Sequence, residues 1–399
     1  MSKKYLVTYK KRKMDLKGAL SILDLDEIEL QRGANLLAVG RLGKNTPVHL
    51  ENIGITIVRL EQRDVKRLLA NSEILAIEED SEVRVQGGEP YKPVEVLLNN
   101  NRLNYINHQE VNHVKTTPVP VWNVQKVKAP DTWALGIDGS GINLAIFGTG
   151  IAAHSDLIVA GGESFMTESI AEPETTPVYK DEHGHGTQCG IVAAGRHGYD
   201  GVAKNCNLYA VKVLNKEGKG RWSEVLAGMN WCIQNKMQVA SIELGGETEP
   251  AFATATAIKN CQDCGLTVVI AADNKSGKAP SWLCFSANSL IVNTSSASSS
   301  DTKPMETVGQ GNNTVAEILS KTIKNESHLA DPVNDITDST YLDNKYSIMS
   351  GDSMTTGPSC SHIAGLATLV YQKYLDIRGQ MAKDKDYYNK EHTLKQPIT

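Results

Sequence analysis

The stretch NLYAVKVLNKEGKGRWSEVLAGMNWCIQNKMQVASIELGG, residues 207–246, decides the fold. It starts with the alternating β-branched run NLYAVKVL, passes through the helical pattern SEVLAGMNWCIQNK and ends in a second apolar run, QVASIEL. A strand, a helix and a strand in this order predict a right-handed βαβ unit with two parallel strands.

The same alternation continues on both sides of this stretch. Further strand-like runs are INLAIFG, LTVVIAA and SLIVNTS, and further helical patterns are FATATAIKNCQDC and SHIAGLATLVYQKYL. We therefore predict an α/β fold, with a mostly parallel twisted sheet covered by helices on both faces. Functional residues are expected beyond the carboxyl ends of its strands.

Composition divides the chain into four parts. Residues 1–87 mix strand-like KYLVTY and ILAIEEDSEVRV with amphipathic DVKRLLANSEIL, which predicts a small α+β domain. Residues 88–119 carry Gly, Pro and Asn breakers and predict a linker. The α/β domain is expected over residues 120–380 and a flexible, solvated tail over residues 381–399.

Charge and cysteine usage exclude several classes of protein. The net charge of -5 gives no reason to expect nucleic-acid binding, and no apolar run approaches the roughly 20 residues of a membrane span. No signal-peptide core follows the basic start, and the seven cysteines are an odd number that favours thiols over a disulfide framework. We expect a cytoplasmic protein without membrane contact.

Three segments carry the chemistry: GHGTQCGIVAAG from Gly184, AADNKSG from Ala271 and YSIMSGDSM from Tyr346. His185 opens a helix between glycines, where it can act as a general base. Asn274 follows a buried strand and offers an amide donor for an oxyanion. Ser353 lies in a Gly-flanked turn before a helix, which suits a nucleophile. Each residue alone is more typical of a structural His, Asn or Ser, so their joint order carries the prediction.

These segments, together with WNVQKVKAPDTWALGIDGSGINLAIFGTGIAAHSDL from residue 122, resemble the subtilisin-like serine proteases, or subtilases. The resemblance covers about residues 121–375 and implies Asp, His and Ser in that chain order. It also implies that residues 1–87 are a propeptide, a small domain that assists folding and occludes the site, with any small α+β domain as the alternative.

The resemblance assigns residues along the groove and exposes departures from the family pattern. Gly148 stands where the family has its catalytic Asp, so the group that orients His185 is missing. Substrate is expected to pair as an added strand with the backbone of Leu244, Gly245 and Gly246. Two acidic residues, Glu243 and Asp273, replace small residues in the cleft, and Glu243 is a candidate partner for His185, with a solvated carboxylate as the alternative.

The nucleophile segment also departs from the family. The family Ser precedes the His of P-H-V-A-G by five residues, but Ser353 precedes His362 by nine. Four extra residues correspond to about one helical turn. We prefer Ser353 because YSIMSGDSM matches upstream, and we keep Ser359 and Ser361 as alternatives.

No metal ligand set or cofactor is predicted. Asp156 matches a carboxylate that helps to bind calcium in many subtilases, but the loop AAGRHGYDGV looks too short for such a site, so calcium stays only an open alternative. Cys261 and Cys264 lie in a helical pattern without a second pair and are interpreted as core thiols. Asp138 is interpreted as a turn residue.

We therefore expect a subtilisin-type serine endopeptidase, impaired by Gly148, whose partners are an extended peptide or protein substrate and its own N-terminal domain. The alternative is a pseudoprotease that binds peptides or proteins without cleaving them. A deliberately altered relative, in which Gly148 was introduced, also fits the sequence.

Overall fold

The structure is a computed structural model. It describes residues 2–11, 13–25, 31–32, 47–85, 124–125, 127–166, 177–196, 200–246, 248, 250–271, 290–293, 306–308, 336–340, 345–349 and 352–393. The structure describes only the backbone of residues 31–32, 290–293, 306–308, 336–340, 345–349, 352–359 and 381–393.

The N-terminal unit is a sheet carrying two helices on one face. Its elements are β1 (Lys3–Tyr9), α1 (Leu16–Leu23), β2 (Gln31–Arg32), β3 (Val48–Leu50), β4 (Ile55–Leu60), α2 (Gln62–Leu69) and β5 (Ile74–Glu79), with strand order β2-β3-β4-β1-β5. Strand alternation divides the apolar residues of β1: Tyr5, Val7 and Tyr9 pack with α1 and α2, whereas Leu6 joins the core of the larger domain.

The larger domain is built on a seven-stranded sheet of order β15-β14-β13-β11-β7-β9-β8. Every neighbouring pair is parallel except β14 with β15, as predicted. The strands are β7 (Asn143–Gly148), β8 (Val159–Ser164), β9 (Asn207–Lys212), β11 (Val239–Ile242), β13 (Thr267–Ala271), β14 (Leu290–Asn293) and β15 (Glu306–Val308). A separate hairpin joins β16 (Ile336–Thr340) and β17 (Lys345–Met349).

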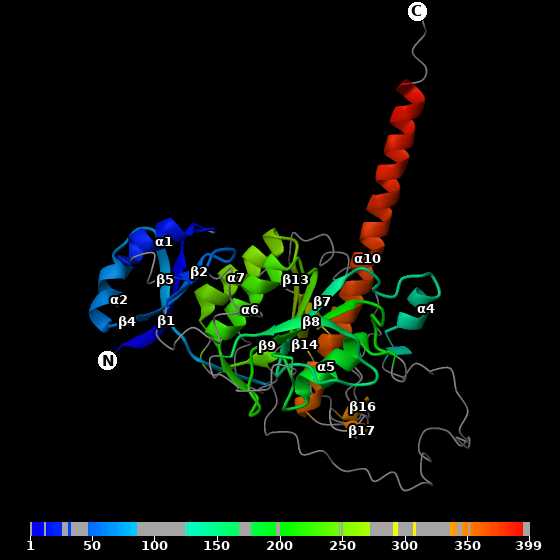
Figure 1. Ribbon diagram of the computed structural model, residues 1–399, viewed down its shortest axis with the longest axis horizontal. Coiled ribbons are helices and arrows are strands. Elements are labelled where there is room, and N and C mark those ends of the chain that lie inside the picture. The colour runs from blue at the N-terminus through cyan, green and yellow to red at the C-terminus, as the bar shows by residue number, and fades with distance from the viewer. Residues whose placement is uncertain are drawn as a thin grey trace, which may run out of the picture.

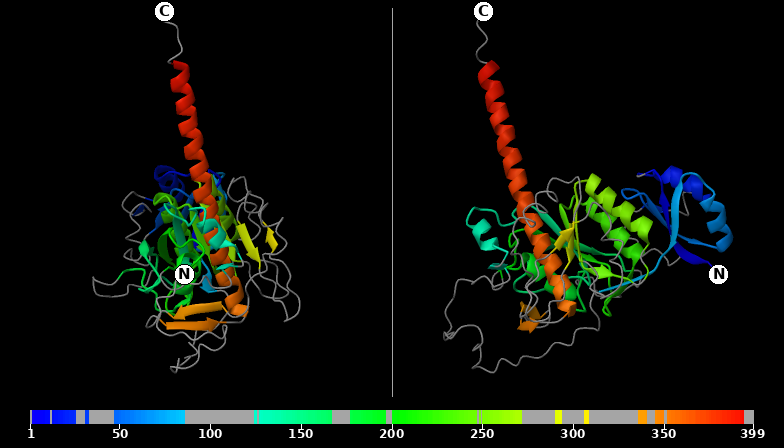
Figure 2. Two further views of the ribbon diagram at one scale, coloured as in Figure 1. Left: turned by 90° about the vertical axis from the view of Figure 1, so that its right-hand side faces the viewer. Right: turned by 180° about the vertical axis from the view of Figure 1, so that it is seen from behind.

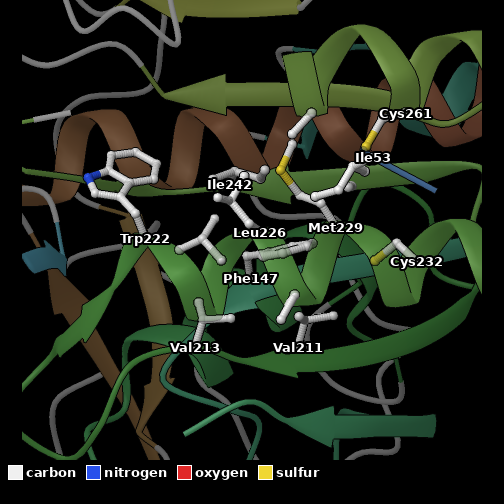
Figure 3. Close-up of a cluster of buried hydrophobic side chains, with 14 of the residues drawn as sticks. Ile53, Phe147, Val211, Val213, Trp222, Leu226, Met229, Cys232, Ile242 and Cys261 are labelled. Carbon is white, nitrogen blue, oxygen red and sulfur yellow. The ribbon is translucent and has the colours of Figure 1, made fainter. Parts of the chain in front are cut away.

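Helices cover both faces of this sheet because its strands are apolar on both sides. In β7, Ala145 and Phe147 face one core with α6 (Trp222–Gln234) and α7 (Ala251–Asp263), whereas Leu144 and Ile146 face the other. Figure 3 shows Phe147 of the sheet packed near Leu226 of α6. The second core holds α5 (His185–Ala194) and α10 (Asp352–Thr393), and the short helix α4 (Ala129–Trp133) lies at its edge.

Helix α10 extends far beyond the body of the molecule (Figures 1 and 2). Its buried apolar residues, from Cys360 to Leu369, pack against the sheet. The backbone remains helical through residues 381–393, for which the sequence predicts a flexible tail. This stretch contains neither Gly nor Pro, so a helix can continue.

The N-terminal unit is docked on α6 and α7 (Figure 1). The Glu78 carboxylate accepts hydrogen bonds from the backbone N–H groups of Phe252 (3.1 Å) and Ala253 (2.9 Å), at the start of α7. The Asp80 carboxylate accepts from the N–H (3.0 Å) and hydroxyl (2.8 Å) of Ser223, at the start of α6. The unit thus supplies both helices with N-terminal caps from outside.

The interpretation of Cys264 as a core thiol is wrong. Among the described residues Cys189, Cys206, Cys232, Cys261 and Cys360 are buried, but Cys264 is exposed. The residue follows the last turn of α7 as its C-cap and has left the apolar face of that helix, so it is not a core thiol. Within the described part of the chain, no helix is long and apolar enough to cross a membrane.

Candidate functional site

His185 is the first residue of α5, where a buried carboxylate fixes the preceding loop. Asp181 accepts hydrogen bonds from the N–H groups of His183 (2.9 Å), Gly184 (2.9 Å) and Thr187 (3.0 Å), and from the Thr187 hydroxyl (2.6 Å). Gly184 has a φ of 106°, a conformation that favours glycine. The carboxylate and the glycine together turn the chain so that the imidazole enters the site.

Gly148 ends β7 beside this imidazole. A Cβ atom built on Gly148 would lie 3.8 Å from Nδ1 of His185 and 3.6 Å from the Cα of Gly186. Nδ1 is the nitrogen that the acid of a Ser-His-Asp triad orients. A side chain at position 148 would therefore start beside this nitrogen, and glycine supplies no carboxylate there.

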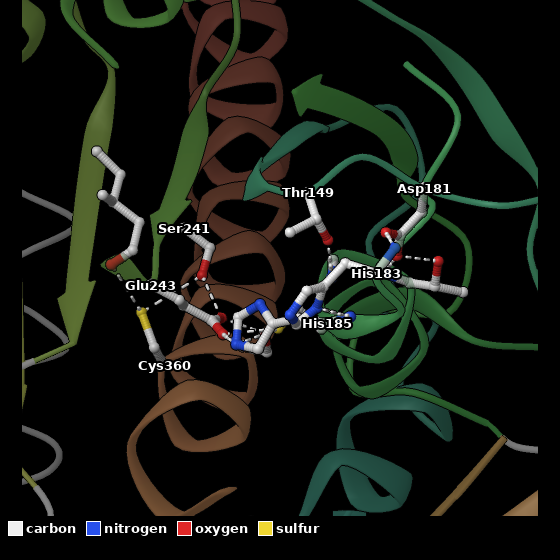
Figure 4. A network of polar contacts seen from close by, with 12 residues as sticks. Thr149, Asp181, His183, His185, Ser241, Glu243 and Cys360 are labelled. Carbon is white, nitrogen blue, oxygen red and sulfur yellow. Dashed lines mark hydrogen bonds and ion pairs between the residues drawn. The ribbon is translucent and has the colours of Figure 1, made fainter. Parts of the chain in front are cut away.

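Glu243 follows β11 and lies on the other side of the imidazole (Figure 4). Its Oε2 is 4.0 Å from His185 Nε2 and accepts a hydrogen bond from the Cys189 thiol at 2.7 Å. Its Oε1 accepts from the hydroxyl of Ser241 at 3.0 Å and from the hydroxyl of Ser361. The Glu243 side chain is 0% exposed, so this is a buried carboxylate and not a solvated one.

Burial shifts the pKa values of both groups toward their neutral forms. Desolvation, with a smaller contribution from neighbouring His183, lowers the pKa of His185 to about 4. Desolvation raises the pKa of Glu243 to about 7, against the opposing hydrogen bonds of Cys189, Ser361 and Ser241. Near neutral pH the imidazole is uncharged and the carboxylate is partly protonated, so the 4.0 Å contact is not an ion pair.

The position of Glu243 bears on its candidate role as a replacement for the missing acid. A triad acid holds Nδ1, which faces Gly148, whereas Glu243 approaches Nε2 at a distance beyond hydrogen-bond reach. Nε2 is the nitrogen that takes the proton from a serine nucleophile. Glu243 therefore lies on the nucleophile side of the imidazole, and the geometry does not favour the replacement.

An extended segment already pairs with the residues that are expected to bind substrate. Strand β6 (Glu82–Val85) lies between β10 (Lys219–Arg221) and β12 (Leu244–Gly245) in a three-stranded antiparallel sheet. Leu244 pairs with Val85 and Gly245 pairs with Arg84. This is the added-strand arrangement expected for substrate at residues 244–246, and the occupant is the end of the N-terminal unit.

Val83 anchors this strand. It is 0% exposed and joins the apolar core that contains Trp222 and Leu244. Gly246 lies close to the backbone, since a Cβ atom built on it would lie 2.5 Å from the carbonyl oxygen of Glu82. A side chain at position 246 would therefore push the added strand out of the groove.

The remaining predicted site residues are only partly placed. Asp273 and Asn274 lie outside the described residues. Ser353 and Ser359 belong to α10, but their side chains are not described. Ser361 is buried with its hydroxyl donated to Glu243. Whether Ser353, Ser359 or Ser361 is the nucleophile thus remains a matter of prediction.

Three residues at the site were not predicted from sequence: Cys189, Ser241 and Asp181. Cys189 follows His185 by four residues in α5, and this spacing on a helix could have indicated that both side chains share a face. Ser241 precedes Glu243 by two residues, so both point to the same side of the chain. Asp181 has no comparable signal, because its role depends on how the loop folds back onto α5.

The carboxylates outside the site have structural partners. Asp138 accepts hydrogen bonds from the Ser140 N–H (3.1 Å) and hydroxyl (2.6 Å) and from Asn205 (2.7 Å), as a turn residue does. Asp156 is buried, and its carboxylate accepts from the hydroxyl of Ser155 at 3.4 Å.

Comparison with known proteins agrees with this architecture. The model of the subtilase family, peptidase S8, matches residues 139–393. An alkaline protease of Alkalihalobacillus alcalophilus is 31% identical over 324 residues, which are 77% of each chain. Subtilisin BL of Lederbergia lenta is 34% identical over 255 residues, 63% of this chain and 84% of the relative. Alkaline elastase YaB of Bacillus sp. (strain YaB) is 28% identical over 373 residues, 93% of this chain and 81% of the relative.

Proposed function

Because this chain belongs to the subtilase family of serine peptidases, we propose that it keeps a working peptide groove but hydrolyses peptide bonds poorly, and that it acts chiefly by binding an extended segment. The partners under this proposal are a peptide or protein strand and the chain's own N-terminal unit. The proposed location is the cytoplasm, supported by the reduced thiols among the described cysteines.

The occupied groove is the observation that carries the binding part of the proposal. Strand β6 pairs with β10 and β12 on both of its edges, and Val83 fills an apolar site between them. An exogenous strand with an aliphatic residue at the position of Val83 would make the same backbone pairs. Binding of such a strand requires β6 to leave, so the N-terminal unit acts as a competitor.

The surroundings of His185 support the impaired chemistry. A general base must be held in the right tautomer, and in the Ser-His-Asp mechanism the acid at Nδ1 does this. Gly148 supplies no such group, while burial disfavours the imidazolium that must form during acyl transfer. In subtilisin, loss of the triad Asp lowers kcat by about 3 × 10⁴, which corresponds to about 6 kcal/mol of barrier.

A second candidate function is slow endopeptidase activity. It is favoured by the position of His185 at the start of α5 and by the order of the His, Asn and Ser motifs along the chain. In this reading Ser353 attacks the scissile carbonyl, His185 transfers the proton and Asn274 stabilises the oxyanion. Asp273 would shape the cleft and favour basic side chains, whereas Glu243, at 0% exposure, does not face the cleft.

Covalent labelling separates the two candidates. The purified chain is incubated with a fluorophosphonate probe, and its mass is followed beside the Gly148→Asp and Ser353→Ala variants. We expect no detectable labelling of the parent, and labelling of Gly148→Asp that is lost when Ser353→Ala is added. Prompt labelling of the parent at one serine would overturn the impaired reading.

A further inference from the structure

Three potential metal ligands meet beside the imidazole: His185, Cys189 and Glu243. His185 and Cys189 lie one turn apart on α5, and Glu243 reaches them from the end of β11. One ligand atom from each side chain lies within 4.8 Å of the other two, and all three residues are buried. From this arrangement we propose that His185, Cys189 and Glu243 bind a zinc ion, a site beyond the proposed peptide-binding function and independent of it.

The separations of the donor atoms are close to those of a tetrahedral zinc site. Zinc bonds of about 2.0–2.3 Å place neighbouring ligand atoms about 3.3–3.7 Å apart. The Cys189 sulfur lies 3.7 Å from Nδ1 and 3.9 Å from Nε2 of His185, and Glu243 Oε2 lies 4.0 Å from Nε2. Two features differ from a bound site: the sulfur lies no nearer to Nε2 than to Nδ1, so the Cys189 side chain must turn toward Nε2, and its contact with Glu243 Oε2, 2.7 Å, is too short. It is a hydrogen bond that opens when zinc replaces the shared proton.

The surrounding hydroxyls bind one oxygen of the Glu243 carboxylate and leave the other to coordinate a metal ion. Ser241 and Ser361 both donate to Oε1, which leaves Oε2 directed at Cys189 and His185. Hydrogen bonds that orient a ligating carboxylate in this way are a regular part of metal sites. The ligand types also select the ion, because a thiolate, an imidazole and a carboxylate together suit zinc better than calcium or magnesium.

Binding is a ligand exchange without redox chemistry. Zinc forms bonds to the Cys189 sulfur, to His185 Nε2 and to Glu243 Oε2, and the thiol proton is released to solvent, together with the carboxyl proton where it is present. The three protein ligands leave the fourth position for water. The ion approaches past His185, whose side chain is 8% exposed.

The test uses the full chain, freed of metal by a chelator and then titrated with Zn²⁺ alone and with Co²⁺ alone. We expect one equivalent of zinc and a Co²⁺ complex with the thiolate-to-cobalt absorption band of a tetrahedral site. Cys189→Ala and Glu243→Gln should each weaken zinc binding by about 100-fold or more, beyond the effect of losing an outer-shell partner. Cys232→Ala, which removes a buried thiol elsewhere, should leave the affinity unchanged.

A gain-of-affinity variant complements these losses. Gly148→Asp places a carboxylate near Nδ1 of His185, which should orient the ring and tighten zinc binding about 10-fold. The proposal is overturned if the parent binds no zinc, if Cys232→Ala weakens binding as much as Cys189→Ala, or if the Co²⁺ complex lacks the thiolate band. Should Cys189→Ala fail to fold, the Co²⁺ spectrum of the parent decides. Because these readouts do not involve hydrolysis, they stand or fall separately from the labelling experiment.

Discussion

Glu243 and His185 are two buried titratable residues whose pKa shifts make stability depend on pH in opposite directions. The raised pKa of Glu243, about 7, means that the folded chain holds a proton which the unfolded chain loses above about pH 4.5. The stability that Glu243 contributes by holding this proton is therefore fully present below pH 4.5 and is lost as the pH rises through 7. The lowered pKa of His185, about 4, gives a contribution that is present above pH 6.5 and is lost as the pH falls through 4.

Glu243→Gln separates the two contributions. Relative to the parent, the variant should gain stability as the pH rises from about 4.5 to 7, by up to about 3 kcal/mol, because it no longer ionises in a buried site. The measurement is chemical unfolding of both chains across this range in the presence of a chelator. Glu79→Gln, at an exposed carboxylate, serves as the control and should show no such trend. A difference between Glu243→Gln and the parent that does not change with pH would contradict the account.

Single residues also show where sequence reasoning reached its limit at the site. The positions of His185 and Gly148 relative to each other follow from the motif order, and the structure places them together. The contact of Glu243 with Cys189 required a side chain from the end of β11 to cross to the second turn of α5. No local sequence pattern predicts this contact, because it depends on the distance between a strand and a helix.

Strand β6 is the element on which the groove assignment depends. The sequence predicts one closing strand from ILAIEEDSEVRV, but the structure divides it into β5 and β6 with Asp80 and Ser81 between them. The backbone N–H of Asp80 still donates to Lys4 of β1, while its carboxylate accepts from Ser223 at the start of α6; beyond Asp80 the chain pairs with the larger domain as β6. Periodicity alone cannot locate this break, because both halves alternate.

Val83→Ala tests how firmly β6 is held. Loss of two methyl groups from a fully buried position should lower the free energy of unfolding by about 1–3 kcal/mol. Val85→Ala on the same strand, at a partly buried position, should cost less than half as much. Both are read from urea unfolding of the full chain. Equal effects of the two substitutions would show that Val83 is not an anchor.

At the scale of the whole molecule, the N-terminal unit and the larger domain share one of the apolar cores. Leu6, Leu50 and Ile55 of the first unit share an apolar cluster with α6 and α7 of the second. The sequence predicts both units and the order of their elements, but not the docking face, because the neighbours Leu6 and Val7 are both aliphatic and only their packing partners distinguish the two faces of β1.

The external helix caps predict how docking responds to mutation. Asp80→Ala removes the group that accepts from Ser223 at the start of α6, which should destabilise the docked state by about 1–2 kcal/mol. Hydrogen exchange in β6 and β10 should become faster, since both strands depend on docking. The control Glu79→Gln should leave exchange in these strands unchanged. Unaltered exchange in Asp80→Ala would show that the cap does not hold the unit in place.

Strand β6 of the N-terminal unit pairs with residues 244–245, and we expect that the chain is not cut after this strand. The most direct test is the intact mass of the purified chain, followed over days at neutral pH beside Gly148→Asp. We predict a single species of 43.4 kDa for the parent, since the base that would drive cleavage beyond Val85 lacks its orienting acid. Conversion of the parent into two fragments divided just after β6, abolished by Ser353→Ala, would contradict the account.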